Sequence, residues 1–247
     1  MESKIFTKIG GDKKLFFSIV IPAHNEALYI AHTLKKIGLL EYPKDLYEVI
    51  VIENGSKDDT YNIAKKFESE NTHIFTSPKK GVSPAKNLGI EKISPKSEWT
   101  IFLDADTILE KYFLNNLNNL LIKDINNIYS VGTTQINPIP FSKKAQHWFR
   151  FYDIGHKFTK TSYAIQIIKS SLLDRVRFNE DLDMGEDLKF LKDAQKFGKF
   201  FFLDTNEVYT STRRFEKFGW WKLFIYWNIP PLLPNFLKKR FVYKVIR

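Results

Sequence analysis

Two carboxylates, Asp104 and Asp106, directly follow an apolar run, residues 99–103. On extended backbone, side chains at positions i and i+2 lie on the same face. Neighbouring carboxylates repel each other unless a cation lies between or beside them, and ligand sets made only of oxygen suit Mg²⁺ or Mn²⁺. A divalent ion there would attract a diphosphate. A polar turn that closes a strand explains the same two residues, so their meaning depends on the rest of the chain.

The first hundred residues alternate between short apolar runs and amphipathic stretches. Four buried strands are predicted over 15–21, 48–53, 73–76 and 99–103. Helices are predicted between them: one capped by Asn25 with Leu28 on its apolar face and ending at Gly38, one through residue 67, and one over 84–93. This order predicts a doubly wound α/β fold with a mostly parallel sheet and helices on both faces.

Polar clusters follow three of these strands, at residues 22–26, 53–56 and 104–106. The carboxyl ends of parallel strands meet at one edge of a sheet, where open α/β folds bind their ligands. Turn chemistry would explain each cluster separately, but it would leave their common edge and acidic character as coincidence. We therefore expect one crevice lined by all three clusters.

The second half of the chain is less regular. Strands are predicted over 130–136, 164–168, 199–203 and 208–212, with helices over 143–154 and from Glu186 to about 197. Glu186 and Asp187 begin the last helix, where the helix dipole favours the ionised carboxylate that a general base requires. The domain boundaries expected are an N-terminal extension (1–14), one domain (15–212) with halves 15–107 and 108–212, and a tail (213–247).

Composition restricts the classes of protein. The chain has 247 residues and no cysteine, which excludes disulfides, thiolate zinc sites and a cysteine nucleophile. Its first residues contain no uninterrupted apolar segment, so a secretory signal is not expected and a cytoplasmic location is.

The tail is basic and aromatic. Residues 217–247 contain seven Lys or Arg and no Asp or Glu, so they supply most of the net charge of +10. The longest uncharged run, 223–237, contains three prolines and is too short to span a bilayer. Aromatic and basic residues favour an anionic membrane surface, which predicts a peripheral location on the inner face of the cell membrane. Packing of the tail on the domain, or a dimer interface, is the alternative.

Five segments together resemble the family 2 glycosyltransferases of GT-A fold over residues 16–212. The segments are Ser18–Glu26 (SIVIPAHNE), Glu53–Thr60 (ENGSKDDT), Gly81–Ile90 (GVSPAKNLGI), Phe102–Asp106 (FLDAD) and Gly185–Asp187 (GED). The resemblance implies an inverting transfer of a hexose-type sugar from a nucleoside diphosphate sugar, with UDP favoured and Mn²⁺ or Mg²⁺ as cofactor. The acceptor implied is a glycan or polyprenyl-linked hydroxyl in the synthesis of cell-envelope glycan, glycolipid or protein glycan.

The resemblance also assigns roles to residues of this sequence. It implies a nucleotide-sugar pocket of Pro22, Ala23, Asn25, Glu26, Glu53, Lys86, Asp104 and Asp106. Glu53 would contact the base, and Lys86 stands near the diphosphate where the family commonly has Arg. Asp106 would bind the metal, with Asp104 on the ribose or in the metal's shell. Asp187 would be the general base, with Glu186 beside it.

Arg213 and Arg214 directly follow the last predicted strand. Guanidinium groups bind phosphate with two parallel hydrogen bonds, so the pair is a candidate clamp for the donor diphosphate or an acceptor phosphate. Two solvated arginines at a strand end are the alternative.

Two other classes of protein remain as alternatives. Haloacid-dehalogenase-like phosphatases also place Asp-x-Asp after a strand, but usually after the first strand of the core, whereas three strand–helix units precede Asp104 here. A non-catalytic basic module on a degenerate fold could bind membrane or nucleic acid. Nucleic acid is not expected as a partner, because an acidic crevice repels phosphates unless a metal is present.

Overall fold

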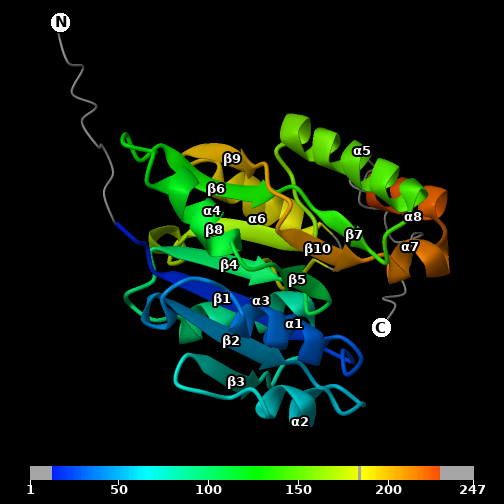
Figure 1. Ribbon diagram of the computed structural model, residues 1–247, viewed down its shortest axis with the longest axis horizontal. Coiled ribbons are helices and arrows are strands. Elements are labelled where there is room, and N and C mark those ends of the chain that lie inside the picture. Colours follow the sequence, from blue (N-terminus) through cyan, green and yellow to red (C-terminus); the bar gives the residue numbers. More distant parts are fainter. Residues whose placement is uncertain (1–12, 183–184, 229–247) are drawn as a thin grey trace, which may run out of the picture.

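The computed structural model describes residues 13–182 and 185–228 (Figure 1). Its strands are β1 (Phe17–Ala23), β2 (Tyr47–Glu53), β3 (Thr72–Thr76), β4 (Trp99–Leu103), β5 (Thr107–Leu109), β6 (Tyr129–Thr134), β7 (Asn137–Ile139), β8 (Ile165–Lys169), β9 (Lys199–Leu203) and β10 (Val208–Ser211). Its helices are α1 (Ile30–Gly38), α2 (Thr60–Lys65), α3 (Val82–Lys92), α4 (Phe113–Leu121), α5 (Lys143–Thr159), α6 (Glu186–Ala194), α7 (Arg213–Phe218) and α8 (Trp220–Asn228).

Within the described residues, seven strands form one sheet in the order β3-β2-β1-β4-β8-β6-β9 (Figure 1). All neighbouring strands run parallel except β8, which is antiparallel to both β4 and β6. Strands β1, β2 and β4 are buried along nearly their whole length, which explains why their sequences are mostly apolar. The predicted α/β fold with a mostly parallel sheet is confirmed.

Helices cover both faces of this sheet, as predicted. Alternate residues of a strand point to opposite faces, so Ile19 packs with the apolar residues of α1 and α4, while Val20 packs with those of α3 and α6. Helix α3 approaches β1 and β2 closely because its residue 89 is glycine: a Cβ at Gly89 would lie 2.3 Å from a methyl carbon of Val20.

A smaller sheet connects the two ends of the expected site. Among the described residues it has the order β5-β10-β7, with β10 antiparallel to β5 and parallel to β7. Thr107 and Thr210 are partners in this register, and their hydroxyl oxygens lie 2.8 Å apart. Because β5 begins directly after Asp106 and β10 ends two residues before Arg213, the pairing brings these two residues together.

The first helix begins later than predicted. Asn25 was expected to cap it, but α1 begins at Ile30, and Asn25 has a left-handed φ of 54°. The Asn25 side-chain oxygen instead accepts a hydrogen bond from the Lys57 amide, so residues 24–27 are held by the loop that follows β2. Leu28, expected on the apolar face, is consequently exposed.

The first sixteen residues of the expected tail form α7 and α8, which pack on the domain. Phe215 and Leu223 are buried, and Phe215 contacts Phe149 and Tyr152 of α5 as well as Trp220 of α8. Residues 229–247, the rest of that tail, lie outside the described residues. In the part of the chain that the structure describes, no helix combines the length and the apolarity needed to cross a membrane.

Candidate active site

Two loops at the carboxyl edge of the sheet are joined by hydrogen bonds. After β1, the amide of Asn25 donates to Ser56 Oγ at 3.0 Å and the amide of Glu26 donates to Thr60 Oγ1 at 2.7 Å. After β2, the Ser56 amide in turn donates to a carboxylate oxygen of Glu53, which is buried. The two clusters predicted to share a crevice are therefore tied together by hydrogen bonds.

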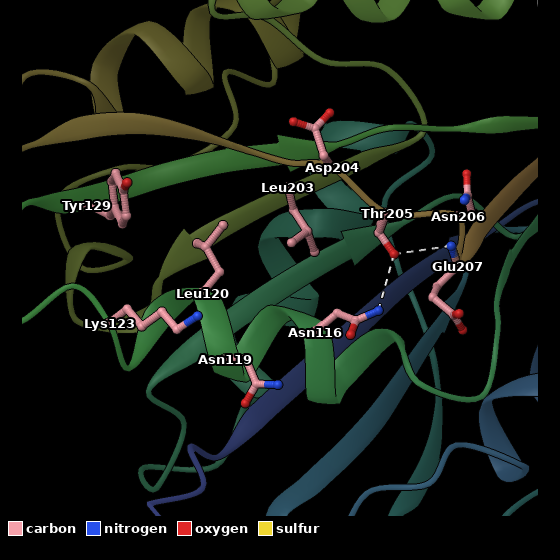
Figure 2. Close-up of a pocket in the computed structure, with 10 residues that line it drawn as sticks. All are labelled: Asn116, Asn119, Leu120, Lys123, Tyr129, Leu203, Asp204, Thr205, Asn206 and Glu207. Atoms are coloured by element: carbon pink, nitrogen blue, oxygen red, sulfur yellow. Dashed lines mark hydrogen bonds between the residues drawn. The ribbon is translucent and has the colours of Figure 1, made fainter. Parts of the chain in front are cut away.

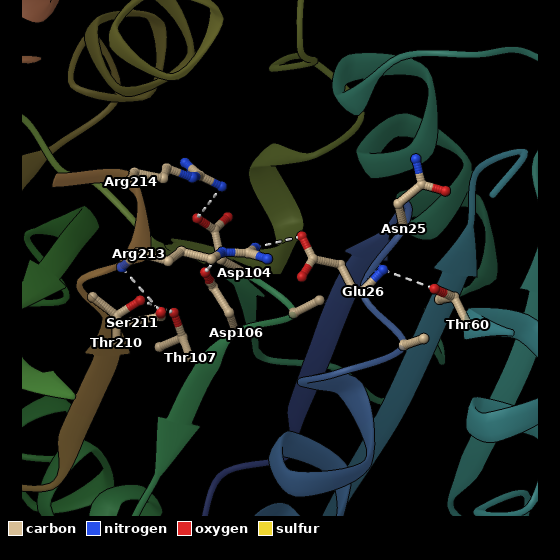
Figure 3. Close-up of polar contacts among 12 residues, drawn as sticks. Asn25, Glu26, Thr60, Asp104, Asp106, Thr107, Thr210, Ser211, Arg213 and Arg214 are labelled. Carbon is tan, nitrogen blue, oxygen red and sulfur yellow. Dashed lines mark hydrogen bonds and ion pairs between the residues drawn. The ribbon is translucent and has the colours of Figure 1, made fainter. Parts of the chain in front are cut away.

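The third cluster faces two arginines from α7. Asp104 and Asp106 lie in a tight turn between β4 and β5 rather than on extended backbone, yet both reach the same helix. Arg213 Nε lies 2.9 Å from Asp106 Oδ2, and Arg213 Nη2 lies 2.6 Å from Glu26 Oε1 (Figure 3). Arg214 Nη2 lies 3.8 Å from Asp104 Oδ2. The strand ends thus converge on one charged cluster, completed by arginines from the last part of the domain.

Burial gives this cluster unusual electrostatics. Burial raises the pKa of Glu26, although the hydrogen bond from Arg213 opposes the shift. For Arg213, burial would lower the pKa, but Glu26 and Asp106 outweigh it and the pKa is raised. The guanidinium also lies 4.4 Å from the centre of the Tyr29 ring. Arg213 therefore stays charged between two buried carboxylates.

A second buried ion pair lies next to the first cluster. Lys86 of α3 is almost fully buried, and its Nζ donates to Asp187 Oδ1 at 2.7 Å and to Gln166 Oε1 at 3.0 Å. The ammonium also lies 4.7 Å from the centre of the Phe178 ring. Burial would lower the pKa of Lys86, but the charges of Asp187, Asp104 and Glu186 together raise it. The expected diphosphate-binding lysine thus holds the expected general base in place.

Glu186 and Asp104 complete this group. Burial, and then the negative charge of Asp187, raises the pKa of Glu186 to about 7. Burial also raises the pKa of Asp104, where Arg214 lowers it and Asp106 raises it further. Asp187 is 30% exposed, so a substrate can reach it.

The structure gathers most of the predicted site residues. Ala23 lies buried at the end of β1 beside the half-buried Pro22. Two contributors were missed: Gln166, which binds Lys86, and Tyr29, which lies against Arg213. Gln166 is the one polar residue between the isoleucines of β8, a signal that could have identified it; Tyr29 left no such signal.

The chemistry of the donor set fits a hard divalent cation that takes most of its ligands from elsewhere. Asp104 and Asp106 offer carboxylate oxygens, and the buried Glu26 Oε2 accepts no hydrogen bond. No cluster of three or more Asp, Glu, His or Cys suited to a metal occurs among the described residues. Mg²⁺ and Mn²⁺ commonly bind through one or two carboxylates together with substrate phosphates and water.

The hollows on the described surface include one beside the charged cluster and one away from it. One, of about 530 Å³, adjoins the charged cluster and is lined by Asn25, Leu28, Tyr29, Lys57, Asp58, Arg213 and Lys217. The other, of about 630 Å³, lies between α4 and the loop after β9, with polar residues such as Asn116, Asn119 and Glu207 around it (Figure 2). The residues of this second hollow include none of those predicted for the site.

An open α/β sheet with polar clusters at its carboxyl edge is typical of α/β proteins that bind a ligand or a substrate there. The model of the family described as "Glycosyl transferase family 2" matches residues 18–181, about two thirds of the chain. The chain therefore belongs to this family. Its fold is the GT-A fold, and the family excludes the haloacid-dehalogenase-like alternative.

Relatives and solved structures agree with this assignment. The chain is 39% identical over 94 residues to "Glycosyltransferase AglE" of Haloferax volcanii, covering 37% of this chain and 30% of that protein. It is 22% identical over 204 residues to "Poly(ribitol-phosphate) beta-N-acetylglucosaminyltransferase TarS" of Staphylococcus aureus strain Mu50, covering 80% of this chain and 36% of TarS. The chain thus spans about a third of the length of these curated relatives.

Solved structures that share the fold include the following two. The crystal structure of S. aureus TarS 1-349 in complex with UDP-GlcNAc has a TM-score of 0.66 at 20% identity, covering 80% of this chain and 58% of that one. Mannosyltransferase PcManGT from Pyrobaculum calidifontis, in complex with GDP-Man and Mn²⁺, has a TM-score of 0.68 at 17% identity, covering 95% and 67%.

Proposed function

We propose that this chain transfers a hexose-type sugar from a nucleoside diphosphate sugar to an acceptor hydroxyl, with inversion at the anomeric carbon. One observation carries the proposal: an acidic cluster paired with Arg213 lies beside the Lys86–Asp187 ion pair at the carboxyl edge of the sheet. With a divalent metal on its carboxylates, the first group would suit a diphosphate leaving group, and the second would supply a base.

The donor would lie across the joined loops after β1 and β2. Pro22, Ala23, Asn25 and Glu53 would line the nucleoside pocket. UDP is the favoured nucleotide; the neighbours solved with UDP-GlcNAc and with GDP-Man support a nucleotide sugar of either kind. Arg213 and Arg214 would stabilise the negative charge that develops on the diphosphate as the sugar leaves.

Asp106, with Asp104 beside it, would hold Mn²⁺ or Mg²⁺ together with the diphosphate oxygens. The metal would supply charge neutralisation at the leaving group. The neighbour solved with Mn²⁺ supports this cofactor.

Asp187 would take the proton of the acceptor hydroxyl. Lys86 holds its Oδ1 at 2.7 Å and so keeps the carboxylate in one orientation. Attack from the Asp187 side, opposite the leaving diphosphate, gives inversion, so an α-linked donor would yield a β-linked product. Glu186 would assist as a neighbouring acceptor contact.

The acceptor would be a glycan or a polyprenyl-linked sugar in cell-envelope glycan, glycolipid or protein-glycan synthesis. The relatives' names, which include a poly(ribitol-phosphate) and a dolichyl phosphate substrate, support acceptors of this kind. We also propose that the protein works in the cytoplasm, peripheral on an anionic membrane. Residues 213–247 would supply that contact.

The test is thermal unfolding with UDP-, GDP- and dTDP-sugars, with and without Mn²⁺, followed by product analysis with the sugar that binds. Donor at about 100 times its dissociation constant stabilises a protein by ~2.7 kcal/mol, or roughly 5–10 °C here. Asp106→Ala should abolish the metal-dependent part of the shift.

The base is tested separately. Asp187→Asn should lower kcat by about 10²- to 10⁴-fold while donor binding persists. Asp193→Asn, an acidic residue of the same helix paired with Lys189 and Lys196, is the matched control and should retain activity. Absence of any nucleotide-dependent shift would favour a non-catalytic module on a degenerate GT-A fold.

A further inference from the structure

Helix α5 presents an unusual outer face. Phe151, Ile154 and Phe158 follow one another at helical spacing and are 54%, 56% and 83% exposed. The opposite face of the same helix, which includes Phe149 and Tyr152, is buried against the domain. The helix therefore has apolar residues on both sides, and the outer stripe is left to solvent.

The stripe continues onto α8. Trp148 lies between the two helices, 4.8 Å from Trp221 and 6.1 Å from Phe151, measured between ring centres. Trp221 is 70% exposed. The five residues Phe151, Ile154, Phe158, Trp221 and Ile225 are together called the aromatic platform below (Figure 1 shows α5 and α8 side by side).

The charges around the platform are mostly positive, although the exposed Asp204 pairs with Lys157 of α5 and Glu216 is exposed on α7. Residues 141–163 contain one carboxylate, Asp153, and it is buried. Lys143 and Arg150 are exposed on α5, beside the apolar stripe. Lys222 is exposed on α8. An apolar surface with a mainly basic rim is complementary to an anionic interface.

The platform adjoins the candidate active site. Helix α7 begins with Arg213 and Arg214. The next residue, Phe215, packs between α5 and α8. When the platform rests on a surface, Arg213 and Arg214 would therefore lie close to that surface.

We propose that the aromatic platform docks on an anionic phospholipid bilayer, with Phe151, Phe158 and Trp221 entering the headgroup region and Lys143, Arg150 and Lys222 contacting the phosphates. The proposal extends the membrane association put forward above, which it takes as its starting point, from the C-terminal segment to α5. A second copy of the chain is the less suitable occupant, because face-to-face pairing would bring two basic rims together. A lipid-linked acceptor would then meet the site at the membrane surface.

The test is co-sedimentation of the full chain with vesicles of phosphatidylcholine containing about 30% phosphatidylglycerol, at roughly 150 mM salt. The wild type is expected to bind these vesicles and to bind pure phosphatidylcholine far less. Phe151→Ser combined with Phe158→Ser should weaken binding at least ~10-fold. Leu39→Ser combined with Ile125→Ser removes two equally exposed apolar side chains elsewhere and should bind as the wild type does.

The basic rim has its own matched pair. Arg150→Glu should weaken binding to anionic vesicles by about fivefold or more, whereas Lys96→Glu, the same charge change on an exposed loop, should have a smaller effect. Wild-type protein that stays in the supernatant, or platform variants that bind like the wild type, would overturn the proposal. So would a platform variant that converts a dimer into a monomer in sedimentation velocity and leaves vesicle binding unchanged.

Donor-dependent thermal shifts on the same variants separate this proposal from the enzymatic one. The donor-dependent shifts should equal those of the wild type, because the substituted residues lie outside the proposed donor site. If vesicle binding follows the platform while no nucleotide sugar binds, the platform stands and the glycosyltransferase proposal fails.

Discussion

Arg213 connects parts of the chain that are far apart in sequence. It pairs with Glu26, 187 residues earlier, and with Asp106, and all three side chains are largely buried. Buried carboxylates are costly unless they are paired, so this guanidinium stabilises the two carboxylates as well as serving the proposed donor site.

Replacing Arg213 by Met should reduce the free energy of unfolding by about 2–4 kcal/mol near neutral pH, because two buried carboxylates lose their partner. Lys36→Met breaks a more exposed pair with Glu110 and should cost below ~1 kcal/mol. Urea unfolding of both variants measures the difference. Equal losses would show that Arg213 is not a structural partner of the cluster.

Glu186 should make stability depend on pH. Its pKa is about 7 in the folded protein and near 4.5 when unfolded, so between these values the folded state binds more protons and stability falls as pH rises. Glu186→Gln removes the titrating carboxyl and with it this fall in stability. The variant should be more stable than the wild type by about 1–2 kcal/mol at pH 8, with the advantage disappearing below pH ~5.

Thermal unfolding from pH 5 to 8 provides the measurement. Glu180→Gln is the control, with an effect of opposite sign. Hydrogen bonds from Asn87 and Lys79 lower the pKa of Glu180, so its carboxylate stabilises the folded protein at high pH and this contribution is lost as pH falls. A pH-independent difference between Glu186→Gln and wild type would contradict the assigned shift.

At the scale of elements, the contact of α3 with the sheet positions Lys86. The helix lies close to β1 and β2 at Gly89, and Lys86 projects from the preceding turn toward Asp187. Residue size at position 89 therefore affects both packing and the ion pair.

Gly89→Ala places a methyl group 2.3 Å from a Val20 carbon and should cost about 1–3 kcal/mol despite the better helix propensity of Ala. Gly38→Ala is the matched control: no atom lies within 4 Å of the added Cβ, so stability should be unchanged or rise by up to ~1 kcal/mol. Denaturant midpoints distinguish the two. Similar effects at both positions would mean that α3 can move away from the sheet.

At the scale of the whole molecule, α7 and α8 belong to the folded core rather than to an appendage. Phe215 and Leu223 are buried, and Arg213 neutralises the acidic cluster. The site and the aromatic platform therefore depend on the same short segment.

A chain ending at residue 212 should lose at least ~4 kcal/mol of unfolding free energy, since two buried apolar side chains contribute about 2 kcal/mol each and Arg213 is also lost. Calorimetry of the truncated and full chains measures this. An undiminished stability would place the domain boundary at 212 and make the remaining residues a separable tail.

The sequence by itself determined the layers of the fold. Apolar runs bounded by turn residues located β1, β2 and β4, because strands buried on both faces leave little room for polar side chains. The aromatic run of β9, which is only partly buried at the end of the sheet, was located in the same way. The same pattern placed the polar clusters at one edge, where Glu26 and Asp106 indeed lie near each other through Arg213. Helix α4 was not predicted, since asparagines interrupt its apolar residues, one of them the buried, hydrogen-bonded Asn118.

Tertiary structure alone decided which charges meet. Lys86 and Asp187 are 101 residues apart, and no local pattern states that a lysine of one helix contacts the first turn of another. It also decided that residues 24–29 form a loop rather than the start of α1, because contacts with the chain after β2 outweigh local propensity there. Finally, periodicity shows that α5 has apolar residues on two faces, but only packing decides which face the domain covers and which remains available to a partner.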